Sequence, residues 1–288
     1  MSVPATVGVL GGGRMGSGIA HAFLVAGSAV SVVEESERWV DAAHARVTAS
    51  VQASIARRTT DESEETLLGR LRIGTDADVF ADAGLVVEAV PEDVSVKTRA
   101  LADIERVVAD GAWIATNTSS IAVGSLATVL RLPGRFGGLH FFNPVPASAL
   151  VEIVIASSTS PEYAVEAAGW VAGLGKESIT VRDSPGFASS RLGNALALEA
   201  MRMVEEGVAS AADIDAAMVL GYRQPLGPLR TSDLVGLDVR LGIAEYLHET
   251  LGSRFEPPRI LRELVDAGAL GRKTGRGFFA YDDEGQPT

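Results

Sequence analysis

The first 183 residues of the chain alternate short apolar runs with longer stretches of helical periodicity. Runs rich in β-branched residues are expected to be strands, and they span residues 6–10, 29–33, 85–88, 113–116, 136–140, 151–155 and 178–181. Most of the segments between them repeat apolar residues at the spacing of a helix. Strands that alternate with helices in this way form a mostly parallel sheet covered on both faces. The chain is therefore predicted to belong to the α/β class.

Two parts of the chain depart from this alternation. Residues 38–70 hold an Ala-rich amphipathic stretch and then the acidic run 61–65, which together predict two helices that project as an arm. After residues 183–186 the strand patterns stop, and helices are predicted over 187–206, 211–220, 227–235, 240–251 and 258–267. The prediction is a sheet domain over residues 1–183 and a small all-α domain over 184–288. A helical unit of this size buries little surface alone, which favours a homodimer formed through it.

Composition excludes several functions. The chain has no cysteine, so disulfides and thiolate catalysis are excluded. Its net charge of −12 argues against a nucleic-acid partner, because phosphate backbones are bound by clustered basic residues. It has no apolar run long enough to span a membrane and no pattern of a secretory signal, so we expect a cytoplasmic protein without a membrane partner.

A glycine-rich turn separates the first predicted strand from the first predicted helix. Gly11, Gly13 and Gly16 form a GxGxxG pattern there. Gly11 permits the tight turn, Gly13 lets the backbone approach a pyrophosphate, and Gly16 lets the helix pack closely on the strand. The N–H groups at the helix N-terminus would then bind the negatively charged phosphates. These glycines, with Arg14 and Met15 between them, are candidate dinucleotide contacts in a Rossmann-type domain, although a glycine turn can also be purely structural.

The strand after this turn ends in a carboxylate. Glu34 stands 18 residues after Gly16, where a carboxylate can accept hydrogen bonds from the ribose hydroxyls of the adenosine. Its charge, with those of Glu35 and Glu37, would repel a 2′-phosphate. We therefore expect NAD as the cofactor in preference to NADP.

The four histidines share no metal-ligand spacing, so no metal site is expected. His21 and His44 lie in predicted helices without a polar partner nearby, and His248 lies in the helical domain, so each is expected to be structural. His140 differs because it ends a predicted strand. Ligands bind beyond the carboxyl ends of the strands in an open parallel sheet, and a histidine there can transfer protons near neutral pH.

Glu152 is the expected partner of His140. It lies in the apolar run 149–155, where a carboxylate is expected to be buried and therefore to need a partner. The twelve-residue separation allows the next strand to bring Glu152 back beside His140. Such a pair would fix the imidazole tautomer and stabilise the imidazolium. The same pattern would also fit two buried residues that satisfy each other in the core and take no part in catalysis.

Residues 116–120, Thr-Asn-Thr-Ser-Ser, follow another predicted strand. Their hydroxyls can cap the next helix, which is the commonest use of such residues. One of them can also bind a substrate oxygen.

Taken together, these motifs resemble the (S)-3-hydroxyacyl-CoA dehydrogenase family, and most closely its short 3-hydroxybutyryl-CoA dehydrogenases. The resemblance runs nearly end to end. Its motifs cover residues 11–20, 86–92 with Lys97, 117–120, 139–146, 150–153, 183–187, 225–237 and 271–279. Several separate motifs in one order are far more specific than the glycine pattern alone.

The resemblance implies roles for the candidate residues near the reacting carbon. His140 is implied as the general base that takes the proton of the 3-hydroxyl while a hydride leaves C3 for the nicotinamide. Glu152 is implied as the residue that orients it, and Ser119 as the hydroxyl that holds the substrate oxygen. Asn117 and Asn143 are implied to position the substrate or the nicotinamide.

The resemblance also implies contacts with the cofactor and with CoA. Glu92, Lys97 and Lys273 resemble cofactor contacts. The arm over residues 38–70 resembles the part that closes over CoA, and Arg57 and Arg58 would meet the phosphates of CoA, unless they are ordinary solvated helix charges.

One departure from the family pattern concerns the substrate. Ser190 stands where the family usually has an asparagine that contacts the substrate near the reacting carbon. Serine is shorter and lacks the separate donor and acceptor of an amide. Losing such a contact weakens transition-state binding by roughly 1–3 kcal/mol, unless a water or Asn194 compensates or the substrate differs.

The sequence therefore predicts an NAD-dependent oxidoreductase that interconverts the 3-hydroxyl and 3-oxo groups of a short-chain acyl-CoA. One alternative is the same chemistry on an acyl group bound to a carrier protein, or on a free 3-hydroxy acid. Another is an NAD-binding protein without catalytic activity.

Overall fold

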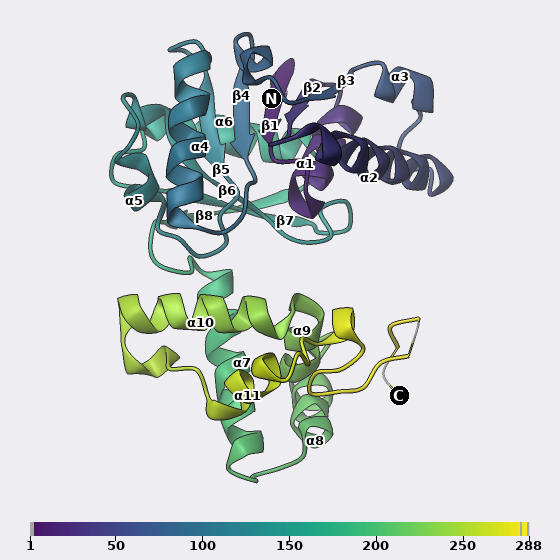
Figure 1. Cartoon of the computed structure of the whole chain (residues 1–288), viewed down its shortest axis with the longest axis vertical. Coiled ribbons are helices and arrows are strands. Elements are labelled where there is room, and N and C mark those ends of the chain that lie inside the picture. Colours follow the sequence, from purple (N-terminus) through teal and green to yellow (C-terminus); the bar gives the residue numbers. More distant parts are fainter. Residues whose placement is uncertain (1–2, 283, 287) are drawn as a thin grey trace. The chain divides into compact units, whose positions relative to one another are not determined.

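The computed structural model describes residues 3–282, 284–286 and 288 of the chain (Figure 1). The chain divides into two compact units, Met1–Ser184 and Pro185–Thr288. The first unit holds all the strands of an eight-stranded sheet, and the second is helical.

The sheet of the first unit has the strand order β3-β2-β1-β4-β5-β6-β7-β8. All neighbouring pairs are parallel except β6 and β7, which are antiparallel. The strands are β1 (Thr6–Leu10), β2 (Ala29–Val33), β3 (Leu71–Gly74), β4 (Leu85–Glu88), β5 (Trp113–Thr116), β6 (Phe136–Phe141), β7 (Leu150–Ile155) and β8 (Glu177–Arg182).

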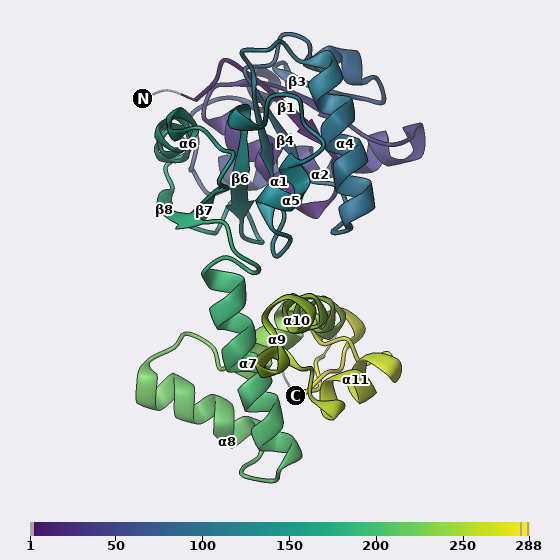
Figure 2. The same ribbon diagram turned by 90° about the vertical axis from the view of Figure 1, so that its left-hand side faces the viewer.

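Helices cover the sheet on both faces, as Figures 1 and 2 show. They are α1 (Arg14–Val25), α2 (Glu37–Ala56), α3 (Glu64–Leu68), η1 (Ala77–Phe80), α4 (Val94–Val107), α5 (Val123–Ala127), η2 (Pro133–Arg135) and α6 (Pro161–Gly173). Apolar side chains of α1, α2, α3 and α6 share one core with alternate residues of the strands, such as Leu139 and Ile153. The opposite face of β6 meets α5, because a Cβ at Gly138 would lie 3.2 Å from Val123.

The strand order reverses direction at β1. This strand pairs with β2 on one side and with β4 on the other, so the chain leaves its carboxyl end toward one side and later returns on the other. In open α/β sheets, the crevice at such a switch point is where ligands bind. The fold therefore places the glycine turn after β1 at the expected ligand position.

The second unit packs its helices around one apolar core that includes Leu198, Met201 and Leu247. Its elements are α7 (Ser189–Glu205), α8 (Ala211–Ala216), η3 (Ala217–Gly221), α9 (Pro228–Val235), α10 (Leu237–Leu251), η4 (Ser253–Phe255), α11 (Arg259–Asp266) and η5 (Arg272–Thr274). The segment η3 continues α8 as a wider π-helical turn.

The predicted fold class is confirmed: a mostly parallel Rossmann-type sheet with an inserted helical arm, followed by an all-α part. The arm consists of α2 and α3. One strand, β3 (Leu71–Gly74), was not predicted, because it is half-exposed at the edge of the sheet and lacks the apolar run that marks the buried strands. Among the described residues, no helix is both long and apolar enough to cross a membrane.

Candidate active site

The glycine turn between β1 and α1 has the geometry that a dinucleotide needs. Gly11 has φ +96°, and a Cβ there would lie 2.9 Å from the Ala89 carbonyl oxygen beyond β4. A Cβ at Gly16 would lie 1.7 Å from the carbonyl oxygen of Gly11, so only glycine fits. A Cβ at Gly13 would meet nothing within 4 Å, which leaves open space in front of the helix. No side chain caps α1 at this end.

Glu34 and an arginine of the arm hold this turn. The Glu34 Oε1 accepts a hydrogen bond from the Gly12 N–H at 3.0 Å. The carbonyl of the same Gly12 accepts from the Ser17 hydroxyl at 2.7 Å and from Arg46 Nη1 at 3.1 Å. The arm is therefore tied directly to the turn, through a residue that the sequence analysis did not single out. Met15 instead packs its side chain against the core.

His140 and Glu152 form a buried pair at the carboxyl end of β6. The antiparallel register places them directly opposite each other, and Nδ1 of His140 lies 2.7 Å from Oε2 of Glu152. Glu152 is fully buried and His140 is 5% exposed. The Phe142 ring lies against the imidazole, with 4.5 Å between ring centroids. The expected pairing is therefore present. The carboxylate fixes the orientation of the imidazole, so Nε2, across the ring from Nδ1, points away from Glu152.

The turn after β5 is organised around Glu92. Its Oε1 accepts hydrogen bonds from the Thr118 hydroxyl at 2.7 Å, from the Ser119 and Ser120 N–H groups, and from both serine hydroxyls. Burial alone would raise the pKa of Glu92. The charge of Lys97, the Thr118 hydroxyl and the Ser119 N–H outweigh burial and lower this pKa below its ordinary value. Ser119 is thus held by a charged carboxylate.

Lys97 lies in the interior and not at an open surface. Its Nζ is 2.8 Å from Glu88 Oε1, 3.3 Å from Glu92 Oε2 and 3.2 Å from the Val90 carbonyl oxygen. An ammonium has three donors, and these three oxygens can use all of them. In this structure Lys97 holds the loop that contains Glu92. A direct contact between Lys97 and the cofactor stays a prediction.

Asn117 and the helix after it are held in a way that the sequence did not indicate. The Asn117 Oδ1 accepts from the Phe141 N–H at 2.9 Å, which ties the ends of β5 and β6 together. Residues 116–120 were expected to cap the next helix, but no side chain among them does so. A residue far along the chain accepts the first N–H groups of this helix instead. Asp183, at the end of β8, accepts the N–H groups of Val123 and Gly124 at the start of α5.

Family comparisons agree with these two parts of the chain. A model described as "3-hydroxyacyl-CoA dehydrogenase, NAD binding domain" matches residues 6–184, and one described as "3-hydroxyacyl-CoA dehydrogenase, C-terminal domain" matches residues 186–281. The chain belongs to the 3-hydroxyacyl-CoA dehydrogenase family. It is therefore an oxidoreductase of this family, and its cofactor is NAD.

Individual relatives cover nearly the whole chain. A 3-hydroxybutyryl-CoA dehydrogenase of Mycobacterium tuberculosis is 42% identical over 279 residues, which are 96% of this chain and 98% of the relative. The crystal structure of FadB2 from the same organism has a TM-score of 0.93 at 41% identity, covering 98% of this chain and all of that one. The structure of (S)-3-hydroxybutyryl-CoA dehydrogenase PaaH1 from Ralstonia eutropha has a TM-score of 0.92 at 38% identity, covering 97% and 100%.

The residues of the first unit fit the NAD of this family. Open space at Gly13 and an uncapped helix N-terminus suit a pyrophosphate, and the two together leave N–H donors for its charge. Glu34 lies beside the same turn, where the family's adenosine ribose would be bound. Among the described residues, no cluster of three or more His, Asp or Glu side chains could hold a metal ion.

A groove in the first unit lies between α1, α2 and the loop after β6. Its volume is about 520 Å³. Arginines and serines line one side, and the loop lines the other; the polar lining residues are Arg14, Ser17, Arg46, Ser50, Ser54, Arg57 and Asn143. Arg46 and Ser50 of α2 and Arg57, the residue that follows its end, share one face because they are spaced by about whole helical turns. Arg58, in contrast, has φ +56° beyond the end of α2 and does not line this groove.

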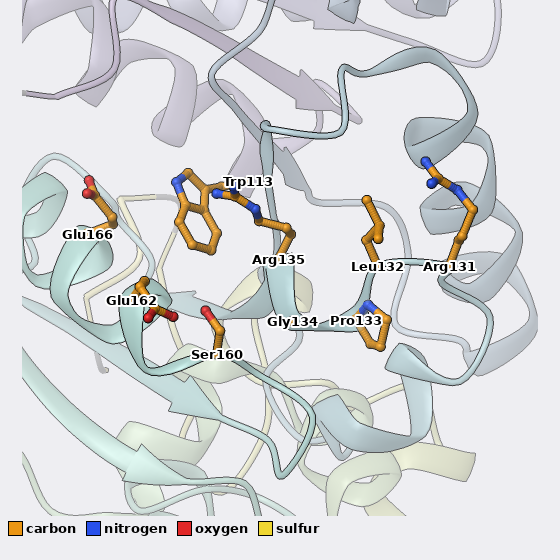
Figure 3. Close-up of a pocket in the computed structure, with 9 residues that line it drawn as sticks. All are labelled: Trp113, Arg131, Leu132, Pro133, Gly134, Arg135, Ser160, Glu162 and Glu166. Atoms are coloured by element: carbon orange, nitrogen blue, oxygen red, sulfur yellow. The ribbon is translucent and has the colours of Figure 1, made fainter.

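A second hollow, of about 580 Å³, lies near the amino ends of strands β5 and β6 (Figure 3). Figure 3 shows the guanidinium of Arg135 beside the ring of Trp113, and the two lie 4.3 Å apart. Trp113 begins β5 and Arg135 precedes β6, so this hollow is at the amino ends of the strands. Ligands of such sheets bind at the carboxyl ends, so we do not assign it to the candidate site.

Two predicted site residues belong to the second unit. Ser190 lies in the first turn of α7 and is half-buried. Lys273 pairs with Asp238, with Nζ 2.6 Å from both carboxylate oxygens. The roles of both residues remain predictions.

The expectation that His21 lacks a polar partner is wrong. Its Nε2 lies 2.9 Å from the Ser54 Oγ of α2. Burial, and then the charge of Lys176, lower the pKa of His21. A neutral His21 therefore connects α1 to Ser54 of the arm, which lines the groove, and its structural role stays a prediction.

Proposed function

We propose that this chain interconverts the 3-hydroxyl and 3-oxo groups of short-chain acyl-CoA thioesters, with NAD as the cofactor. One observation carries the proposal. A buried imidazole–carboxylate pair, His140 and Glu152, stands at the carboxyl end of β6, in an NAD-binding domain of the 3-hydroxyacyl-CoA dehydrogenase family. A solvent-shielded histidine in this position suits proton transfer, and the family comparisons supply the substrate class.

In the direction of oxidation, His140 takes the proton of the 3-hydroxyl. The Nδ1 of the ring is engaged by Glu152, so the exchanged proton is accepted at Nε2. NAD, when bound, accepts the hydride from C3. Glu152 then stabilises the imidazolium that has formed, because an ionised carboxylate hydrogen-bonded to an imidazolium offsets its burial. In reduction His140 returns this proton to the substrate oxygen.

Ser119 is proposed to position the same oxygen. Its hydroxyl donates to Glu92 in the structure. The single proton of the 3-hydroxyl points to His140, so Ser119 must donate to the substrate oxygen, whether this oxygen belongs to a 3-hydroxyl or to a 3-oxo group. The Ser119 hydroxyl can turn to it because Glu92 Oε1 keeps its other donors, the Thr118 hydroxyl and two N–H groups among them.

The groove between α1 and α2 is proposed to take part of the CoA moiety. It combines Arg14, Arg46 and Arg57 on a chain whose net charge is −12, so these cations form a local exception to the overall charge. Guanidinium groups bind phosphate oxygens in a bidentate manner, which suits the phosphates of CoA. Asn143 on the other side of the groove remains a candidate contact of the substrate or the nicotinamide.

A homodimer is part of this proposal. Leu192, Leu220 and Tyr222 of the second unit are more than two-thirds exposed. Large apolar side chains exposed to this extent on one helical unit support an interface with a second copy.

The function is tested by initial rates of NADH oxidation. These rates are measured with acetoacetyl-CoA, with an acetoacetyl group on a carrier protein, and with free acetoacetate. We expect the highest kcat/KM on the CoA thioester. A higher value on the carrier-bound or free acid would overturn the CoA assignment. NADH binding without turnover of any of the three would show a non-catalytic protein.

A further inference from the structure

Arg46 of α2 contacts two parts of the first unit at once. Its Nη1 donates to the Gly12 carbonyl oxygen at 3.1 Å, inside the glycine turn between β1 and α1. The same side chain lines the groove between α1 and α2. A guanidinium has five N–H donors in a planar fork, so one bond to Gly12 leaves others for a ligand in the groove. One side chain therefore serves the turn that suits a pyrophosphate and the groove that suits CoA.

The carbonyl that Arg46 holds belongs to the peptide unit between Gly12 and Gly13. This peptide is trans, so its planar geometry directs the Gly13 N–H opposite to the Gly12 carbonyl. Arg46 and the Ser17 hydroxyl both donate to this carbonyl. On the other side of Gly12, Glu34 accepts from the N–H. These bonds fix the orientation of the Gly13 N–H, which stands at the N-terminus of α1, where the pyrophosphate of NAD is expected.

The bond from Arg46 also affects the strength of the Gly13 donor. A peptide whose carbonyl accepts a hydrogen bond is polarised, and its N–H becomes a better donor. A charged guanidinium polarises the peptide more than a neutral hydroxyl such as that of Ser17. Arg46 is therefore placed to strengthen the binding of a pyrophosphate at the turn, through the peptide that it holds.

Arg46 makes this contact from an exposed position on α2. An exposed arginine side chain loses rotamer entropy when a contact holds it in one conformation. A phosphate bound in the groove would order the guanidinium, so NAD would then bind to a turn whose Arg46 is already in place. The positive charge beside both anions also reduces the repulsion between them. Both effects make the two ligands favour each other.

We propose that Arg46 couples the two ligand sites of the first unit, so that a CoA thioester in the groove and NAD at the glycine turn each bind more tightly when the other is present. This inference rests on the proposed function, in which the groove takes part of the CoA moiety. Arg46 is a positioning residue in this role, because it acts on the pyrophosphate through the Gly12–Gly13 peptide. Coupling between two sites is reciprocal, so both ligands gain by the same factor.

NADH binding with and without butyryl-CoA tests this coupling. Butyryl-CoA has no 3-oxo group, so NADH does not reduce it. Fluorescence titration measures the dissociation constant of NADH in the free enzyme and in enzyme saturated with butyryl-CoA. We expect saturation to lower this constant by roughly three- to thirtyfold in the wild type. Titration calorimetry of butyryl-CoA, with and without NADH, is expected to give the same factor.

Two arginine variants separate this coupling from the general charge of the groove. Arg46→Met keeps the length of the side chain without its charge or its donors, so the ratio of the two NADH constants is expected to fall to about one. Arg57→Gln is the matched control. Arg57 lines the same groove, but it follows Arg46 by eleven positions (57 − 46), which is about 16 Å along a helix. We expect Arg57→Gln to weaken butyryl-CoA binding and to keep the wild-type ratio at saturation.

If Arg46→Met does not fold, Arg46→Lys replaces it. Lysine keeps the positive charge but loses the planar fork that reaches the turn and the groove together. Its ratio of NADH constants is expected to lie between one and the wild-type value, and a ratio equal to that of the wild type would then contradict the role of Arg46.

Three further results would overturn the inference. An NADH constant of the wild type that butyryl-CoA leaves unchanged overturns it, and turnover of acetoacetyl-CoA in the same preparation leaves the proposed function intact. A wild-type ratio in folded Arg46→Met, or an equal loss of the ratio in Arg57→Gln, overturns the specific role of Arg46. Absence of both butyryl-CoA binding and acetoacetyl-CoA turnover overturns the inference and the proposed function together.

Discussion

At the scale of single residues, the site depends on side chains whose partners are fixed by burial. Glu152 is fully buried, and a buried carboxylate requires a strong partner, which His140 supplies at 2.7 Å. The sequence indicated this pair, because twelve residues suffice for two adjoining strands and a loop. It did not indicate the acceptors of Lys97, since charges far apart in sequence are matched only by the packing of β4, α4 and the turn after β5.

Arg57 and Arg58 form a matched pair for testing the CoA groove. Arg57 lines the groove, whereas Arg58 follows the end of α2 in a left-handed conformation and does not. We expect Arg57→Gln to raise the KM for acetoacetyl-CoA by roughly three- to thirtyfold, because one charge-assisted contact is lost, and to leave kcat nearly unchanged. Arg58→Gln should change neither value by more than about twofold. Steady-state kinetics of both variants measure this, and equal effects of the two would refute the assignment of the groove.

At the scale of elements, the turn between β1 and α1 contains two glycines with different expected roles. Gly16 is needed for packing, and Gly13 for binding the cofactor. Ala at position 16 would bring a Cβ within 1.7 Å of the Gly11 carbonyl oxygen, so we expect Gly16→Ala to lower the melting temperature and to lose NADH binding. Ala at position 13 meets nothing within 4 Å, so Gly13→Ala should keep the melting temperature and still weaken NADH binding by about tenfold or more. Thermal unfolding and fluorescence titration measure the two effects. Unchanged NADH affinity in a folded Gly13→Ala protein would mean that the turn does not hold the cofactor.

The Glu92 cluster joins the loop after β4 to the turn after β5, and it predicts a pH dependence. The folded pKa of Glu92 is lowered from its ordinary value of 4.5, so the stabilisation is present above that value and is lost as the pH falls through the folded pKa. We expect Glu92→Gln to be less stable than the wild type at pH 7, and the difference to shrink on acidification below pH 4.5. Urea unfolding between pH 7 and 3 measures it, with the exposed Glu65→Gln as control. A difference that stays constant over this range would contradict the ionised cluster.

Element positions were more accessible to sequence analysis than their ends. Strands β1, β2, β4 and β5 have the predicted bounds, because each is an apolar run bounded by turn residues. The edge strand β3 is half-exposed, so it lacks the apolar pattern that marks the buried strands. The π-helical turn over Ala217–Gly221 was predicted as ordinary helix, since apolar spacing does not distinguish one extra residue per turn.

At the scale of the whole molecule, the second unit is expected to hold two copies together. We expect a homodimer at micromolar concentration, because Leu192, Leu220 and Tyr222 are exposed on the second unit. A Leu220→Glu, Tyr222→Glu variant should show a smaller mass in light scattering, while the control Val165→Glu, in the first unit, should not. A monomeric wild-type protein would contradict this expectation.

The central claim is that the His140–Glu152 pair transfers the proton of the 3-hydroxyl. Its most direct test is the kcat for acetoacetyl-CoA reduction by the His140→Gln variant, measured beside its NADH affinity. The account predicts that kcat falls by about a hundredfold or more while NADH binds as tightly as to the wild type, since the glycine turn is untouched. A kcat within a few-fold of the wild-type value would contradict it.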